Sequence, residues 1–156
     1  MLTKALDRES LLAAVNDIYE TQMPFNRLLG IRIAALDFDD VRVRVDMQEA
    51  FVGNHVKGIL HGGVISATLD LTGGLIALVG VLEAMDEPTV EDVRSRFGRI
   101  GTIDLRVDYL RAGQGDYFLS TGVIMRMGRK VAVIRTEFRN DRDMLIAAGT
   151  GSYIVG

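Results

Sequence analysis

Cysteine is absent from this chain of 156 residues, and only two histidines are present, His55 and His61. Without cysteine, neither a disulfide framework nor a thiolate metal site can form. Two histidines are fewer than the ligands that a metal site usually needs, so we expect no bound metal. The lack of cysteine gives no sign of an oxidising compartment and favours a cytoplasmic location.

An excess of basic residues is also missing, since the formal net charge is −3. A protein that binds nucleic acid would need a basic face, so nucleic acid is not expected as a partner. Residues 1–12 contain no continuous apolar segment behind their charges, so no signal peptide is expected. Repeats, linkers and low-complexity segments are absent, and the length is that of about one domain. We therefore expect a single domain over residues 1–156.

A long uninterrupted apolar run is missing as well. Residues 59–82 are mostly apolar, but Asp70 lies near the middle of them. A charge at the centre of a bilayer is costly, and the apolar runs on either side of Asp70 are too short to span one. The segment is predicted to be a core helix, and no membrane association is expected. A carboxylate on such a helix needs a partner or a use, because a buried charge costs several kcal/mol.

Periodicity assigns the segments before this helix. Apolar residues recur at helical spacing over about residues 8–22, and either Asp7 or Ser10 can cap the start. Residues 41–45 alternate between valine and arginine, which is typical of a half-buried strand.

A short helix starting at Thr89 and four strands are predicted after the central helix. Residues 102–110 form a strand whose apolar face carries Ile103, Leu105, Val107 and Tyr109. A hairpin turning at Gly128–Arg129 and a final strand up to residue 156 follow. One apolar helix and a run of strands favour an α+β fold, in which an antiparallel sheet wraps around one long central helix.

The start of the central helix has the properties of an oxyanion site. The first N–H groups of a helix have no intrahelical acceptor, and Gly62 and Gly63 let a ligand approach them closely. Gly62 and Asp70 are nevertheless roughly 12 Å apart along one helix, so they cannot act on the same carbonyl group. They could meet if a second copy of the helix ran antiparallel beside the first, as in a two-fold dimer.

Three segments resemble the hotdog-fold acyl-CoA thioesterases, in particular the phenylacetate-pathway type. They are "NHVKGILHGGVISATLDLTGG", "GTIDLRVDYLR" and "MGRKVAVIRTEFRNDRDMLIAAGTGSYIV". The similarity extends from about residue 25 to the end of the chain, and it includes the spacing of nine residues from His61 to Asp70. The resemblance implies a hotdog fold, hydrolysis of acyl-CoA without a cofactor, and a homodimer or a dimer of dimers.

The resemblance also implies roles for individual residues. Gly62 would donate its backbone N–H to the thioester carbonyl oxygen, and Asp70 would act as general base or nucleophile. Thr102 matches a hydroxyl that positions the attacking water. Asn54 would help to polarise the carbonyl, although the usual spacing of the family's asparagine falls on His55.

Other candidates have weaker support. His61 is expected to shape the turn by packing and hydrogen bonding rather than to act as a base. Arg111, Arg126, Arg129 and Lys130 could bind the phosphates of coenzyme A, since arginine suits phosphate recognition. Two alternatives stay open: a hotdog hydratase or dehydratase of acyl-CoA or acyl-carrier protein, and an acyl-CoA-binding module without catalysis.

Overall fold

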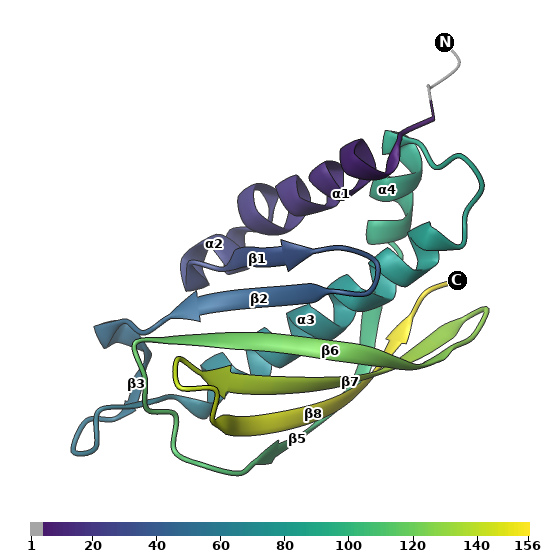
Figure 1. The fold of residues 1–156 in the computed structure, drawn as a ribbon. Helices are drawn as coiled ribbons and strands as arrows, with labels where there is room; N and C mark the ends of the chain where they lie inside the picture. The colour runs from purple at the N-terminus through teal and green to yellow at the C-terminus, as the bar shows by residue number, and fades with distance from the viewer. Residues whose placement is uncertain (1–4) are drawn as a thin grey trace.

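The computed structural model describes residues 5–156, so residues 1–4 of the predicted domain lie outside the described part. Figure 1 shows its helices and strands. The helical segments are α1 (Arg8–Asp17), the π-helix η1 (Ile18–Gln22), α2 (Pro24–Leu29), the 3₁₀ turn η2 (Glu49–Phe51), α3 (Gly62–Glu83) and α4 (Val90–Phe97). The strands are β1 (Arg32–Leu36), β2 (Val41–Asp46), β3 (Val52–Asn54), β4 (Ile59–Leu60), β5 (Gly101–Tyr109), β6 (Tyr117–Met127), β7 (Val131–Asn140) and β8 (Leu145–Ile154).

Six strands form one antiparallel sheet in the order β1-β2-β6-β7-β8-β5. Helix α3 packs against one face of this sheet and contacts β2, β5, β6, β7 and β8. Helix α1 lies beside β1 at the edge of the sheet and contacts α4, and α4 packs against α3 (Figure 1). The α+β class predicted from the sequence is therefore confirmed, with one long helix covered by a single sheet.

The two halves of α3 differ in their surroundings. Every residue from 72 to 80 is buried, which accounts for the nearly uniform hydrophobicity of this half. In the first half, Gly63 is exposed, and Ser66, Ala67, Asp70 and Leu71 are partly exposed on a common face. The helix is long and apolar enough to cross a bilayer, but 72% of its most apolar window is buried inside the fold. It is the core helix of this fold, and Asp70 lies where that core is open.

The predicted starts of α1 and α4 and the predicted hairpin turn are confirmed. Asp7 accepts a hydrogen bond from the backbone N–H of Ser10 at 2.8 Å and caps α1. Thr89 and Asp92 form a reciprocal capping box at the start of α4. The predicted hairpin turn is present between β6 and β7, where the N–H of Gly128 donates to the carbonyl of Val131.

Helix α2, the turn η2 and the hairpin of β3 and β4 were not predicted. Helix α2 begins at Pro24 and ends at Gly30, which has a positive φ of 63°. This is the usual arrangement of proline at the first helical position and glycine after the last, so the sequence did contain the signal. The hairpin of β3 and β4 runs over residues 52–60 and leads directly into α3.

Candidate active site

Asp70 and Thr102 meet at the open part of α3. The Thr102 hydroxyl donates a hydrogen bond of 2.9 Å to Oδ1 of Asp70. Asp70 comes from the middle of α3 and Thr102 from the start of β5, at the edge of the sheet. Asp70 and Thr102, which are 32 residues apart in the sequence, are therefore direct neighbours, and the hydroxyl fixes one oxygen of the carboxylate.

The orientation of Thr102 depends on a β-bulge. Strict alternation would place Ile103 on the face of β5 that carries Leu105, and Thr102 on the opposite face. The register with β8 instead shifts between Thr102 and Asp104, so that Thr102 lies opposite Tyr153 and Asp104 opposite Ser152. The prediction that Ile103 belongs to the apolar inner face is therefore wrong, and its side chain is 54% exposed. Ile103 is the extra residue of the bulge, and it allows Thr102 to face the helix.

Tyr153 supports the backbone of α3 at the same place. Its hydroxyl donates to the carbonyl oxygen of Asp70 at 3.1 Å. Its ring occupies the space left by Gly73 on α3 and Gly151 on β8, where a Cβ atom on either glycine would overlap with it. Burial raises the pKa of the Tyr153 phenol well above its usual range, and the charge of Asp70 raises it further. Tyr153 thus stays protonated and acts as a donor.

A pocket of about 470 Å³ opens beside Asp70 and Thr102. Its walls come from the N-terminal helices, from α3, and from the segment that joins α4 to β5, and most of them are apolar. The lining residues are Tyr19, Met23, Phe25, Asn26, Ala67, Asp70, Leu71, Gly74, Phe97, Gly98, Ile100, Gly101 and Thr102. Burial raises the pKa of the Tyr19 phenol well above its usual range, so Tyr19 contributes an uncharged ring to the wall. Asp70 is the one acidic residue of this lining.

The start of α3 offers one free backbone donor. The N–H of Gly62 has no hydrogen-bond acceptor among residues 5–156, whereas the N–H of Gly63 donates to Nδ1 of His61 at 2.8 Å. His61 is therefore the N-cap of α3, consistent with a role in shaping the turn, and Gly63 is already occupied. Tyr109 closes the other side of Gly62, since its hydroxyl donates to the Gly62 carbonyl at 3.1 Å. Of the two glycines, Gly62 is therefore the one whose N–H is left open to a ligand.

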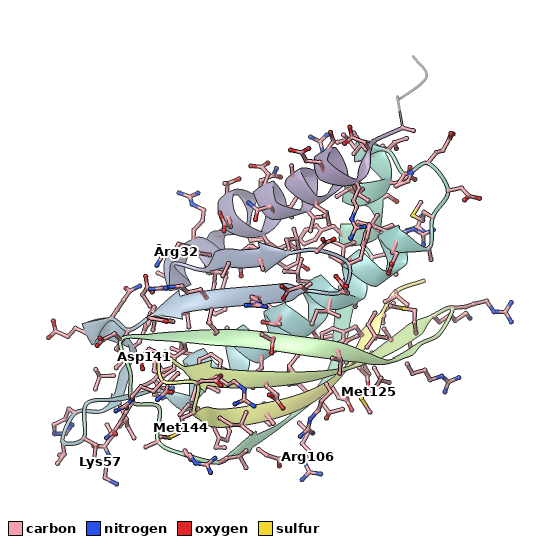
Figure 2. All side chains as sticks on the ribbon, in the orientation of Figure 1. Arg32, Lys57, Arg106, Met125, Asp141 and Met144 are labelled. Atoms are coloured by element: carbon pink, nitrogen blue, oxygen red, sulfur yellow. The ribbon has the colours of Figure 1, made fainter. Side chains whose placement is uncertain are left out.

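Asn54 and His55 belong to the small hairpin that leads to α3. Oδ1 of Asn54 accepts hydrogen bonds from the N–H groups of Val56 and Lys57 and so stabilises the turn. The Nδ2 group of Asn54 makes no such bond within the described residues, and His55 is exposed. Figure 2 shows Lys57 at the tip of this projecting loop. In residues 5–156, no three His, Asp or Glu side chains are grouped so as to hold a metal ion.

The four predicted phosphate ligands do not lie together in one chain. Arg111 follows β5 at the Tyr109 end, where its guanidinium donates to the carbonyl of Leu145 at 3.0 Å. Arg126, Arg129 and Lys130 are exposed at the hairpin of β6 and β7. This hairpin lies near the opposite end of β5, because Ile154 pairs with both Val131 and Gly101.

The fold and this site place the chain in the class of hotdog proteins that carry a carboxylate on the central helix. Its family follows from comparison with known proteins. The sequence model of the thioesterase superfamily matches residues 57–147. The chain belongs to this superfamily.

Individual relatives cover nearly the whole chain. The medium/long-chain acyl-CoA thioesterase YigI of Escherichia coli is 39% identical over 155 residues, which are 99% of this chain and 100% of YigI. The YigI protein of Salmonella typhimurium has the same identity and coverage. Among solved structures, a protein of Shewanella oneidensis related to the thioesterase superfamily has a TM-score of 0.91 and 42% identity, covering 96% of this chain and 97% of its own.

Proposed function

We propose that this protein hydrolyses medium- and long-chain acyl-CoA thioesters at a metal-free site. One observation carries the proposal: the Asp70 carboxylate, hydrogen-bonded to Thr102, lies at an apolar pocket of about 470 Å³. Such a pocket suits an acyl chain, since each buried CH₂ contributes about 0.8 kcal/mol. The names of the YigI relatives support the same substrate class.

The chemistry follows from the donors and acceptors present. The Thr102 hydroxyl uses its single hydrogen in the hydrogen bond to Asp70. The lone pairs of the Thr102 oxygen therefore remain free to accept a hydrogen bond from water. A water that donates one proton to Asp70 and the other to Thr102 keeps a lone pair for attack on the thioester carbonyl. As the oxygen–carbon bond forms, the proton moves to Asp70. The carbon–sulfur bond then breaks, and the proton passes to the leaving thiolate to give the free acid and coenzyme A. The alternative in which Asp70 itself attacks the carbonyl uses the same contacts and stays open.

The oxyanion donor for this step comes from a second chain. Gly62 and Asp70 of one chain are roughly 12 Å apart along α3, which is too far for one carbonyl. Strand β5 is an edge strand of the sheet, and one of its sides is unpaired. An unpaired edge of this length is a template for pairing with another chain. We therefore expect two copies to join through antiparallel pairing of their β5 strands.

Charges and spacing favour one register for this pairing. A two-fold axis at Leu105, the middle residue of β5, places Asp104 opposite Arg106 of the partner subunit, and oppositely charged facing residues stabilise a strand pair. Figure 2 shows that Arg106 projects from the sheet, away from α3. The same axis brings Thr102 beside the partner's Tyr109, which is hydrogen-bonded to Gly62 in each chain. Each dimer would then contain two complete sites.

The same dimer would gather the basic side chains. Arg111 of the partner subunit would approach the end of β5 that carries Thr102. Arg129 and Lys130 of the same chain as Thr102 lie near this end of β5. Together they would offer positive charge from both chains to the phosphates of coenzyme A. A further dimer of dimers, a single domain over residues 1–156 and a cytoplasmic location stay predictions.

The test is a panel of CoA esters with detection of the released thiol. Hydrolysis that is fastest for acyl chains of medium and long length supports the proposal, with a dimer expected by light scattering. A preference for phenylacetyl-CoA would instead support the phenylacetate-pathway type that the sequence motifs resemble. Hydration of enoyl-CoA without thiol release would identify a hydratase, and tight binding without turnover would identify a binding module.

A further inference from the structure

The bulge in β5 separates two residues with different surroundings. Thr102 faces the helix and bonds to Asp70 at 2.9 Å. Asp104, two residues later, faces the outer side of the sheet and contributes nothing to the pocket lining. Between them, the exposed Ile103 has no partner in the register with β8. The direction in which Thr102 points is therefore set by whether the extra residue lies at position 103.

Asp104 is bonded to the neighbouring strand at this interruption. Its Oδ1 accepts a hydrogen bond from the backbone N–H of Ser152 at 3.1 Å. A bulge disturbs the regular ladder of backbone hydrogen bonds. The carboxylate of Asp104 supplies an acceptor for a backbone N–H at the place where the ladder is irregular. An unbulged strand would bring Ile103 opposite Tyr153 and turn Thr102 to the outer face.

We propose that Asp104 is a positioning residue for the hydrolytic reaction: it holds the bulge at Ile103 and so keeps the Thr102 hydroxyl directed at Asp70. It does this from the outer face of the sheet, without touching substrate. The inference rests on the proposed function for its kinetic consequence, whereas its structural consequence, the orientation of Thr102, does not depend on the substrate.

Two substitutions of Asp104 test this role. Asp104→Ala removes the acceptor for the Ser152 N–H, and we expect kcat to fall about three- to ten-fold with little change in KM, because only the positioned hydroxyl is affected. Asp104→Asn keeps an Oδ1 acceptor and should retain nearly full kcat. Asp104→Val removes the acceptor with a residue of high strand propensity, so it replaces the alanine variant if that variant does not fold.

A double-mutant cycle separates positioning from general damage. Thr102→Val removes the hydroxyl whose direction is at issue, so adding Asp104→Ala to it should cost no further kcat. If the two losses multiply, Asp104 does not act through Thr102. Arg106→Ala is the matched control, because it removes the residue proposed to face Asp104 across the dimer. An equal loss of kcat in this control would assign the effect to the subunit contact and overturn the proposal.

A crystal structure of the Asp104→Ala variant gives a readout that needs no activity. We expect the Thr102 hydroxyl to lie beyond hydrogen-bond distance of Asp70 in a substantial fraction of molecules. An unchanged bulge with the 2.9 Å bond intact would overturn the inference even if the enzyme hydrolyses acyl-CoA. Conversely, a wild-type protein inactive on all CoA esters would refute the proposed function, and the structure of the variant would still decide the role of Asp104.

Discussion

Replacement of Gly62 by proline removes the N–H proposed to bind the thioester oxyanion, because the proline nitrogen carries a ring carbon in place of the hydrogen. Gly62 is the first residue of α3, a position where proline is favoured because its fixed φ suits a helix start. The preceding residue, His61, has φ −67° and ψ 135°, which is the extended conformation that a following proline requires. The backbone can therefore accept Gly62→Pro, and the donor is lost.

The expected effect is large because few donors are available at this helix start. Loss of one oxyanion donor typically lowers kcat by about 100- to 1,000-fold, or about 2.7–4 kcal/mol. Gly62→Ala is the matched control, since it adds a Cβ and keeps the N–H. This Cβ would lie 3.2 Å from Cε1 of Tyr109, so the exposed ring must shift by a few tenths of an ångström. We expect the alanine variant to lose at most about five-fold in kcat, because the ring can move.

The same variant tests whether two chains share each site. Gly62→Pro and Asp70→Asn damage different halves of the proposed site, so a mixed dimer would have one site with both defects and one with neither. Random pairing of equal amounts gives about half mixed dimers, each with one intact site of two, and activity should recover to roughly a quarter of wild type.

Three outcomes would refute this reasoning. Full kcat in Gly62→Pro would show that its N–H does not stabilise the transition state. Equal losses in Gly62→Pro and Gly62→Ala would assign the effect to the contact with Tyr109. A mixture as inactive as its parents, with mixed dimers verified by mass spectrometry, would show that the two halves are not combined across chains.

Further predictions concern the carboxylate, the helix contact and a helix cap. Asp70→Asn should lower kcat by at least about 100-fold at unchanged melting temperature, whereas near-normal turnover would remove Asp70 from the mechanism. Gly73→Ala should destabilise the fold by about 1–3 kcal/mol in urea unfolding, because its Cβ overlaps with the ring of Tyr153. Gly74→Ala, whose nearest contact would be an ordinary 3.8 Å, should be neutral or stabilising, and equal effects at both sites would contradict the packing argument. The pKa of Asp92 is lowered by its hydrogen bond from the N-cap threonine, so its contribution to stability is present above the ordinary pKa of 3.8 and is lost as the pH falls below it. The melting temperatures of wild type and Asp92→Asn should therefore converge on acidification, and a constant difference would argue against the cap.

The sequence alone determined the features that depend on near neighbours along the chain. The alternation of residues 41–45 gave a strand with one buried face, and Asp7 and Thr89 identified two helix starts, because caps and periodicity act within a few residues. The carboxylate of Asp70 in an apolar helix indicated a site, since an unused charge there would be costly. The distance between Gly62 and Asp70 along one helix also indicated a second chain, since it follows from the helix rise alone.

Only the tertiary structure decided how these features meet. The alternation of β5 placed Ile103 inward, and one extra residue in the register with β8 reversed this and turned Thr102 toward Asp70. Gly73 makes room for the ring of Tyr153, which lies 80 residues further along the chain. The pocket wall combines the N-terminal helices with the end of α4, which no local pattern connects. Periodicity reflects interactions between residues that are close in the sequence. Register, bulges and pocket walls are instead set by pairing and packing between distant segments.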